Sequence, residues 1–513
     1  MRSVWKTVML CALGLCSGSQ IGAGEEIGGP FSWSVGKYCE KKGETVVVSV
    51  PKGEANGQHF VSTPFDLRQG YGKNLIFHIR AEAKNVSVPP EKWNGVKFML
   101  SFRTAEGEPI YKHPVQLWGT FQKELFFSVD IPKGASNGKL SLGLQNSSGE
   151  VRFDLASLRI TRGEQIFRKV NENHIAEYSD AVRNRPVRRG VMLGNNLTEK
   201  DYRDLAAYGA NLGRAQLVRA WGQVNTDLDL EEYDRWLNSR LDRLEQEFQW
   251  AEQNGIRLII DLHSPPGGRD ELKELRLQSE KKYLDHFLEV WRRIVRRFQG
   301  KKALWGYNLV NEPNQNRAVK YDYWTVQKMA AEEIRKIDPE TPIYVESNLW
   351  SAPATFSYFS PIKLKNIIYQ FHMYQPGQYT HQLVGGNFGE KGADELVSYP
   401  GVIGWKRWDK QELRNTLAPV REFQQKHQAK IFCGEFSAII WAPGADKYLR
   451  DCIELFEEYG WDWTYHAFRE WEGWSVEHAG APGKLRPSAD NDRKRVLLEY
   501  FRRNQKGNEE GRR

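Results

Sequence analysis

Two glutamates in this chain lie directly after apolar runs. At such positions a carboxylate can take part in catalysis. Residues 303–310 form an apolar, β-prone run that stops at Asn311, Glu312 and a proline, and residues 430–433 lead in the same way through a glycine to Glu435. Each run predicts a buried strand whose carboxyl end lies at a surface. Cleavage of a glycosidic bond requires one protonated carboxyl group and one ionised carboxylate. The pair therefore suits glycoside hydrolysis.

The elements that must position these glutamates are predicted to form a (β/α)8 barrel over residues 190–505, because strand-like and helical segments alternate there. Catalytic side chains of such barrels stand at the carboxyl ends of the strands. The predicted strands are residues 190–194, 210–214, 256–263, 303–310, 343–347, 366–374, 430–436 and 461–468. The predicted helices are residues 200–208, 233–254, 283–298, 323–337, 411–427, 452–459 and 493–503. Residues 506–513 are expected to form a disordered tail.

The Asn-Glu pair at the end of strand four and the glutamate at the end of strand seven resemble the retaining glycoside hydrolases of clan A. The barrel region as a whole resembles family 5, the cellulase and β-mannanase family. The resemblance implies that Glu312 is the acid/base, that Glu435 is the nucleophile, and that Asn311 binds the sugar 2-hydroxyl group. It also implies that Arg214, which ends strand two, pairs with the nucleophile and keeps it ionised.

Further positions on strands three and six match the same family. His263 belongs to an Asp-Leu-His sequence before a loop rich in proline and glycine, and the resemblance places it along the sugar site. On strand six, His372 and Tyr374 match the family's His-x-Tyr sequence and lie on one strand face. The resemblance implies that Tyr374 donates a hydrogen bond to the nucleophile and that His372 orients the substrate or the acid/base.

Strand eight departs from the family pattern. Family members present a tryptophan platform for the sugar there, but this sequence has His466 at the expected place. We expect the platform to have moved to Trp471 or Trp474, which leaves the choice between a β-1,4-glucan and a mannan substrate open. Glu346 and Glu470 are additional carboxylates near strand ends, and we assign them secondary roles.

Two other functions fit part of the pattern. The Asp261 and His263 pair also suits a barrel metallohydrolase, but that class needs further histidine ligands, and residues 190–194 contain none. A non-catalytic carbohydrate-binding protein is the second alternative, against which the complete set of expected catalytic residues argues. We therefore expect an enzyme that uses no cofactor and no metal ion.

Residues 27–162 show short β-rich runs separated by turn residues, which is typical of an all-β sandwich. The strand rhythm resembles that of jelly-roll carbohydrate-binding modules. Trp93, Trp118 and Tyr111 are either a sugar platform or ordinary core residues. Residues 163–189 are polar and charged, and we interpret them either as a linker between the sandwich and the barrel or as the first decoration of the barrel.

Residues 1–24 resemble a secretory signal peptide, with Arg2 and Lys6 before a short apolar run and small residues after it. That run is too short to span a membrane. We expect a secreted or periplasmic monomer without a membrane anchor. The net charge of +8 arises from 73 basic and 65 acidic residues without a basic cluster, which argues against nucleic-acid binding. The expected partner is a β-linked polysaccharide or oligosaccharide.

Overall fold

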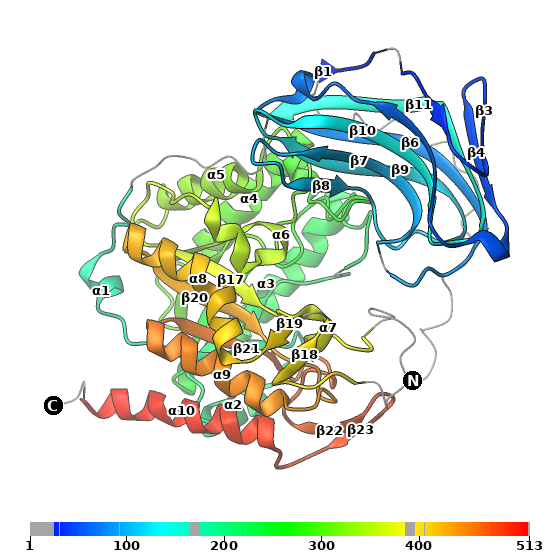
Figure 1. Cartoon of the computed structure of the whole chain (residues 1–513). Helices are drawn as coiled ribbons and strands as arrows, with labels where there is room; N and C mark the ends of the chain where they lie inside the picture. Colours follow the sequence, from blue (N-terminus) through cyan, green and yellow to red (C-terminus); the bar gives the residue numbers. More distant parts are fainter. Residues whose placement is uncertain are drawn as a thin grey trace. The chain divides into compact units, whose positions relative to one another are not determined.

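A computed structural model describes residues 25–29, 31–91, 93–164, 174–220, 222–384, 396–404 and 406–510 (Figure 1). The expected signal peptide, residues 165–173 of the expected linker and the last three residues of the expected tail lie outside this range. The described residues up to 164, together with Arg317–Lys320, form one compact unit, and the remaining described residues form a second. No helix in the described part of the chain is long and apolar enough to cross a membrane.

The first unit contains two antiparallel sheets, as the sequence predicts. One sheet has the order β3 (Cys39–Lys42), β4 (Thr45–Val50), β11 (Gly149–Glu164), β6 (Lys73–Val86) and β9 (Gly119–Ile131), with β1 (Glu25–Glu26) also paired to β11. The other has the order β2 (Ser34–Val35), β5 (Gln58–Pro64), β10 (Ser136–Gln145), β7 (Gly95–Arg103) and β8 (Pro109–Lys112). Alternate apolar residues of both sheets, among them Phe77 and Phe98, form a shared core.

The second unit is a closed barrel of eight parallel strands, which confirms the predicted fold. Its strands, in order around the barrel, are β12 (Arg189–Leu193), β13 (Leu212–Gln216), β14 (Arg257–Asp261), β15 (Leu304–Asn308), β16 (Ile343–Glu346), β17 (Ile367–Met373), β20 (Lys430–Phe436) and β21 (Asp462–Phe468). β21 pairs with β12 and closes the ring. The predicted fourth strand ends earlier than expected, so that Asn311 and Glu312 lie on the loop after β15.

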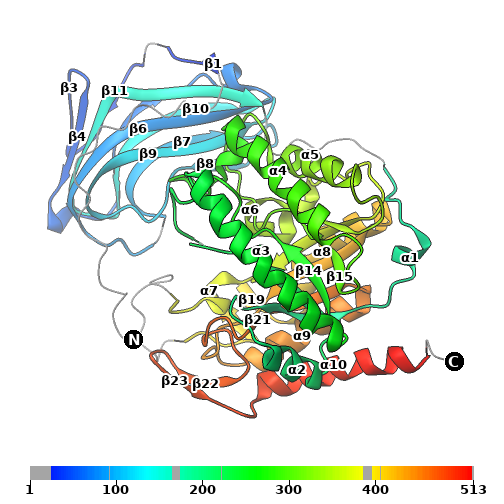
Figure 2. The same ribbon diagram turned by 180° about the vertical axis from the view of Figure 1, so that it is seen from behind.

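Helices surround the barrel, with α8 and α9 in front in Figure 1 and α3 and α4 in front in Figure 2. The longer helices are α2 (Glu199–Ala207), α3 (Leu230–Gln253), α4 (Lys281–Phe298), α5 (Tyr323–Arg335), α8 (Lys410–His427), α9 (Ala445–Tyr459) and α10 (Asp492–Glu510). Short helices α6 (Asn348–Ser351) and η4 (Pro353–Ser357) follow β16, and α7 (Gly377–Thr380) follows β17. Two hairpins, β18 (Gly401–Ile403) with β19 (Lys406–Trp408) and β22 (His478–Ala481) with β23 (Lys484–Pro487), complete the unit. Helix α10 includes residues 506–510, which we had assigned to the tail.

Residues 174–189 differ from the expected linker because they pack across the amino-terminal ends of the barrel strands. The guanidinium groups of Arg185 and Arg188 lie 3.8 and 4.2 Å from the centre of the buried Trp305 ring on β15. The Tyr178 hydroxyl donates to the carbonyl of Ile367 at 2.8 Å and accepts from the backbone N–H of Lys430 at 2.7 Å. This segment, including the short helix α1 (Asp180–Arg183), therefore closes one end of the barrel.

The two Tyr178 hydrogen bonds predict a stability effect. In a Tyr178→Phe variant, backbone groups of β17 and β20 lose their partner, and each unsatisfied buried group costs about 1–3 kcal/mol. We expect the free energy of unfolding to fall by about that amount, measured by chemical denaturation. Tyr500→Phe is the control, because its hydroxyl contacts charged side chains, such as Glu454 at 3.5 Å, rather than the backbone of a strand. Equal stability of both variants would contradict the expectation.

Candidate active site

Arg214 is the buried cation at the centre of the candidate site. It lies on β13 with its side chain inside the barrel, where a guanidinium group requires several acceptors. Nη1 donates to Glu435 Oε1 at 2.6 Å, and Nη2 donates to Asn311 Oδ1 at 2.7 Å. Nη2 also lies 3.1 Å from carboxylate oxygens of both Asp261 and Glu346. Burial lowers the pKa of Arg214, but these carboxylates outweigh it and raise the pKa above its usual value.

Glu435 is held as an anion through both carboxylate oxygens. While Oε1 accepts from Arg214, Oε2 accepts from the Tyr374 hydroxyl at 2.9 Å and lies 3.8 Å from His372 Nδ1 and 3.6 Å from His466 Nδ1. Burial favours the neutral acid, but the positive charges of His372, His466 and Arg214 hold the pKa of Glu435 well below its usual range. An ionised carboxylate with fixed orientation is what a nucleophile requires.

Glu312 lies on the loop after β15, facing the same space as Glu435. Its carboxylate Oε1 is 2.9 Å from His372 Nδ1, and single ligand atoms of Glu312, His372 and Glu435 all lie within 4.8 Å of one another. Carboxyl groups about 5–5.5 Å apart are typical of retaining glycosidases, whereas inverting enzymes separate them by about 6.5–9.5 Å. The close approach of single oxygens of Glu312 and Glu435 is compatible with the shorter of these two separations.

His372 bridges the two carboxylates as a cation. Burial lowers its pKa, but the negative charges of Glu435, Glu346 and Glu312 outweigh burial and raise the pKa of His372 to about 9. At neutral pH the ring is therefore an imidazolium group. Its positive charge helps to keep the nearby Glu435 carboxylate ionised.

Asn311 and His263 are fixed next to this centre. Asn311 Nδ2 lies 3.0 Å from His263 Nε2, and His263 Nδ1 lies 2.8 Å from Asp261 Oδ2. Both ring nitrogens of His263 therefore face protein groups, and Asp261 is paired with Arg214. This arrangement disfavours the metallohydrolase alternative, because a histidine ligand must offer a free nitrogen to the metal.

A sequence model of the family described as cellulase (glycosyl hydrolase family 5) matches residues 184–471, more than half of the chain and nearly the whole barrel. The chain belongs to glycosyl hydrolase family 5. Its membership confirms the resemblance seen in the sequence and makes the protein a glycoside hydrolase.

Individual relatives of this family 5 chain are distant. Endoglucanase C of Acetivibrio thermocellus is 26% identical over 294 residues, which cover 52% of this chain and 84% of the relative. Cellodextrinase A of Ruminococcus flavefaciens is 22% identical over 310 residues, or 56% of this chain and 88% of the relative. Among solved structures, Thermotoga maritima Cel5A in complex with mannotriose matches with a TM-score of 0.48 and 20% identity over 61% of this chain and 98% of the other.

Strand eight of this family 5 barrel forms a separate group of side chains. His466 Nε2 lies 2.8 Å from Glu470 Oε2, and the His466 ring stacks on Trp474 with 5.7 Å between ring centres. Burial lowers the pKa of His466, but Glu470 and Glu435 outweigh it and raise that pKa. Trp471 is 42% exposed and meets Trp474 edge to face. The structure thus places His466 against the nucleophile and Trp471 further out, beside Trp474.

Sequence reasoning missed several polar residues that hold the site. Asn308 accepts from Arg214 at 2.9 Å, Gln370 lies 3.1 Å from His372, and Arg269 donates to the carbonyl of Glu312 at 2.9 Å. Glu346, which we had considered secondary, contacts three of the site residues directly. Asn308, Glu346 and Gln370 are polar residues in otherwise apolar strands, and that signal could have identified them.

Proposed function

We propose that the protein is a retaining β-glycosidase that hydrolyses a β-linked polysaccharide or oligosaccharide, either a β-1,4-glucan or a mannan, by double displacement. The observation that carries this proposal is the pair of carboxylates with single oxygens within 4.8 Å of each other, of which Glu435 accepts a hydrogen bond from the Arg214 guanidinium group. The similarity to an endoglucanase supports the glucan.

In the first step, Glu435 Oε2 attacks the anomeric carbon while Glu312 gives its proton to the leaving oxygen, so that a glycosyl ester forms and the aglycone departs. In the second step, Glu312 as a carboxylate takes a proton from water, whose oxygen attacks the same carbon and releases Glu435. Asn311 is held by Arg214 and His263, and we assign its amide to the sugar 2-hydroxyl group.

The experiment that tests this function is reducing-sugar release by the purified protein from a panel of β-glucans, mannans and xylans, followed by NMR of the first-formed product. We expect release from glucan or mannan and a β-configured product. A first-formed α-sugar would overturn the retaining mechanism, and no release from any β-glycan would overturn the proposed activity.

Trp471 is our candidate for the displaced sugar platform, because its indole ring is exposed next to the strand-eight group. Loss of a stacking face should weaken sugar binding by about 1–3 kcal/mol, by analogy with burial of a large apolar side chain. We therefore expect a Trp471→Ala variant to show a raised KM with little change in kcat. Trp474→Ala is the comparison, and an effect on KM in that variant alone would assign the platform to Trp474.

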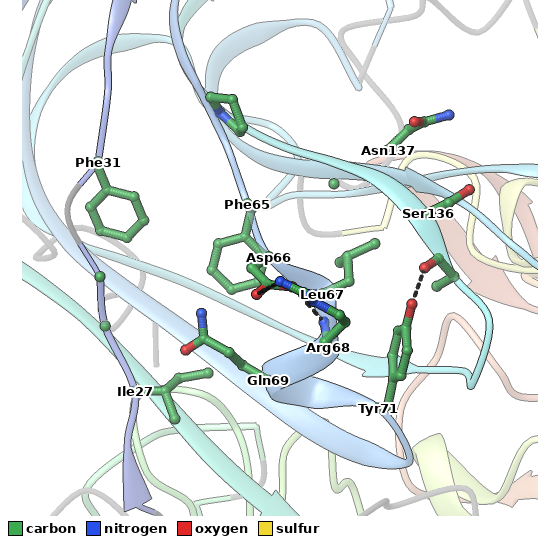
Figure 3. Close-up of a pocket in the computed structure, with 15 residues that line it drawn as sticks. Ile27, Phe31, Phe65, Asp66, Leu67, Arg68, Gln69, Tyr71, Ser136 and Asn137 are labelled. Atoms are coloured by element: carbon green, nitrogen blue, oxygen red, sulfur yellow. Dashed lines mark hydrogen bonds and ion pairs between the residues drawn. The ribbon is translucent and has the colours of Figure 1, made fainter.

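We also propose that the protein is secreted or periplasmic and that its sandwich binds carbohydrate. Trp93 and Tyr111 are 55% and 62% exposed, as a sugar platform requires, whereas Trp118 packs on the sandwich core. A separate cavity of about 590 Å³ in the sandwich contains Phe31, Phe65 and Tyr71 in its wall (Figure 3). Retention of the full chain on insoluble glucan, compared with a Trp93→Ala and Tyr111→Ala double variant, tests the binding.

A further inference from the structure

Glu346 is a fully buried carboxylate that the chemical steps do not use. It ends β16, and five donor groups point at its two oxygens. Oε1 accepts from Arg214 Nη2 at 3.1 Å, Asn308 Nδ2 at 2.9 Å and Gln370 Nε2 at 2.7 Å, and Oε2 accepts from the backbone N–H of Glu312 at 2.8 Å and from the Ser351 hydroxyl. A carboxylate with this many partners has one orientation, so the groups bound to it are also fixed.

Glu346 contacts Glu312 through the Glu312 backbone and not through the Glu312 side chain. Glu312 has φ = 48°, in the left-handed region that non-glycine residues rarely occupy. Its N–H donates to Glu346, and its carbonyl accepts from Arg269 Nη2. An unfavourable backbone conformation persists only where its surroundings determine it. Glu346 is thus one of the two groups that hold the peptide units flanking the Glu312 side chain.

The segment after Glu346 is left-handed as well. Leu349, Trp350 and Ser351 have φ values of 50°, 62° and 57°, in a region that non-glycine residues rarely occupy. Three contacts tie this turn to the loop that carries Glu312. Trp350 N–H donates to the Pro313 carbonyl at 3.2 Å, and the Asn348 side-chain amide bonds both the N–H and the carbonyl of Gln315, at 2.9 and 3.0 Å. The loop that carries Glu312 and the left-handed turn therefore fix each other. Ser351 and Glu346 form a further link between the two.

The nucleophile is anchored by other groups. Glu435 is bound by Arg214 and Tyr374, and Arg214 keeps Asp261 and Asn308 as partners even where Glu346 is changed. The Glu312 N–H, in contrast, donates to the carboxylate that would be lost. A change at Glu346 should therefore act on the two catalytic glutamates unequally.

We propose that Glu346 is a positioning residue for Glu312: through the Glu312 N–H and the left-handed turn at Leu349–Ser351, it sets the distance between the acid/base carboxyl group and the leaving oxygen. This inference rests on the proposed function. Proton transfer needs a heavy-atom distance of about 2.6–3.2 Å, and a displacement of about 1 Å can cost about 100-fold in rate. The nucleophilic step does not share this requirement.

The test is a Glu346→Gln variant, which keeps the side-chain shape but removes the charge and one acceptor oxygen. We expect kcat/KM on soluble β-glycan to fall by about 100-fold, mainly through kcat. On a dinitrophenyl β-glycoside, whose leaving group needs no proton, we expect the release of dinitrophenol in the first turnover to stay within about 3-fold of wild type. Ser351→Ala removes one donor to Glu346. We expect this variant to show the same dependence on the leaving group, with a smaller loss of kcat/KM on β-glycan.

The matched control is Asp261→Asn. Asp261 is another fully buried carboxylate 3.1 Å from the same Arg214 nitrogen, but it pairs with Arg214 and His263 rather than with the Glu312 backbone. We expect the Asp261→Asn substitution to reduce the rates on both substrates by the same factor. Near-ultraviolet circular dichroism checks that each variant folds, and if Glu346→Gln does not fold, Ser351→Ala decides. Equal loss on both substrates, or no loss, would overturn the positioning role. A wild-type protein inactive on both substrates would instead overturn the proposed function.

Discussion

The Glu435→Gly enzyme is expected to be inactive on polysaccharide and on an activated aryl glycoside alike. In the proposed mechanism Glu435 forms the bond to the anomeric carbon, and a better leaving group cannot replace a missing nucleophile. By analogy with removal of nucleophiles in other enzymes, kcat should fall by about 10⁴-fold or more. Azide can occupy the space left by the carboxylate, next to Arg214, and attack from the same side. The expected product is the α-glycosyl azide, identified by NMR.

Glu470→Gln provides the control for this experiment. Glu470 is a second carboxylate near the mouth of the barrel, but it contacts His466 rather than Glu435. We expect its loss to reduce kcat by less than about 10-fold, since no bond to the sugar depends on it. If the Glu435→Gly variant turned over the aryl glycoside without azide, Glu435 would not be the nucleophile.

The barrel and the positions of Glu312 and Glu435 could be predicted from sequence because they produce strong local patterns. An apolar run that ends at Asn311 and Glu312 has few interpretations, and the runs before Arg214, His372 and Glu435 are similar. Their meeting in one place follows from the barrel itself, since all parallel strands present their carboxyl ends on one face. Local pattern and global fold therefore agree at these positions.

The segment at residues 174–189 could not be predicted in this way. It is polar and charged, which is typical of a linker, and its function depends on two arginines that stack on Trp305 and on one tyrosine hydroxyl. Arginine covers an aromatic face without being apolar itself, so hydropathy gives no sign of the contact. The left-handed turn at Leu349–Ser351 could not be predicted from the sequence either, because no glycine or asparagine occupies its three positions.

The role of Glu346 shows a different limit. A sequence can identify a carboxylate at a strand end, but it does not show that donors of five different residues meet at the carboxylate of Glu346. Whether a carboxylate attacks the sugar or holds its neighbours depends on which of its oxygens remain accessible. Both oxygens of Glu346 are enclosed by donors, whereas single ligand atoms of Glu312 and Glu435 lie within 4.8 Å of each other and of His372.

The Glu312→Ala enzyme is expected to separate the two steps of the reaction. The natural leaving group needs the proton of Glu312, and general acid catalysis contributes about 10²–10⁴-fold, so kcat/KM on polysaccharide should fall by that factor. A dinitrophenyl leaving group needs no proton. Its glycosylation step should therefore remain near the wild-type rate, with Glu435 still bound by Arg214 and Tyr374. The glycosyl ester should then accumulate, because no base activates water, and dinitrophenol should appear as a burst.

Azide distinguishes this outcome from the one expected for Glu435→Gly. An anion needs no base, so azide should attack the accumulated ester from the face where Glu312 stood and restore turnover. Two displacements at the anomeric carbon retain its configuration, and the product should be the β-glycosyl azide. The two variants thus give opposite anomers from one substrate, which NMR resolves. An α-azide from Glu312→Ala and a β-azide from Glu435→Gly would exchange the two roles, and the guanidinium group of Arg214 would then lie on the acid/base rather than on the nucleophile.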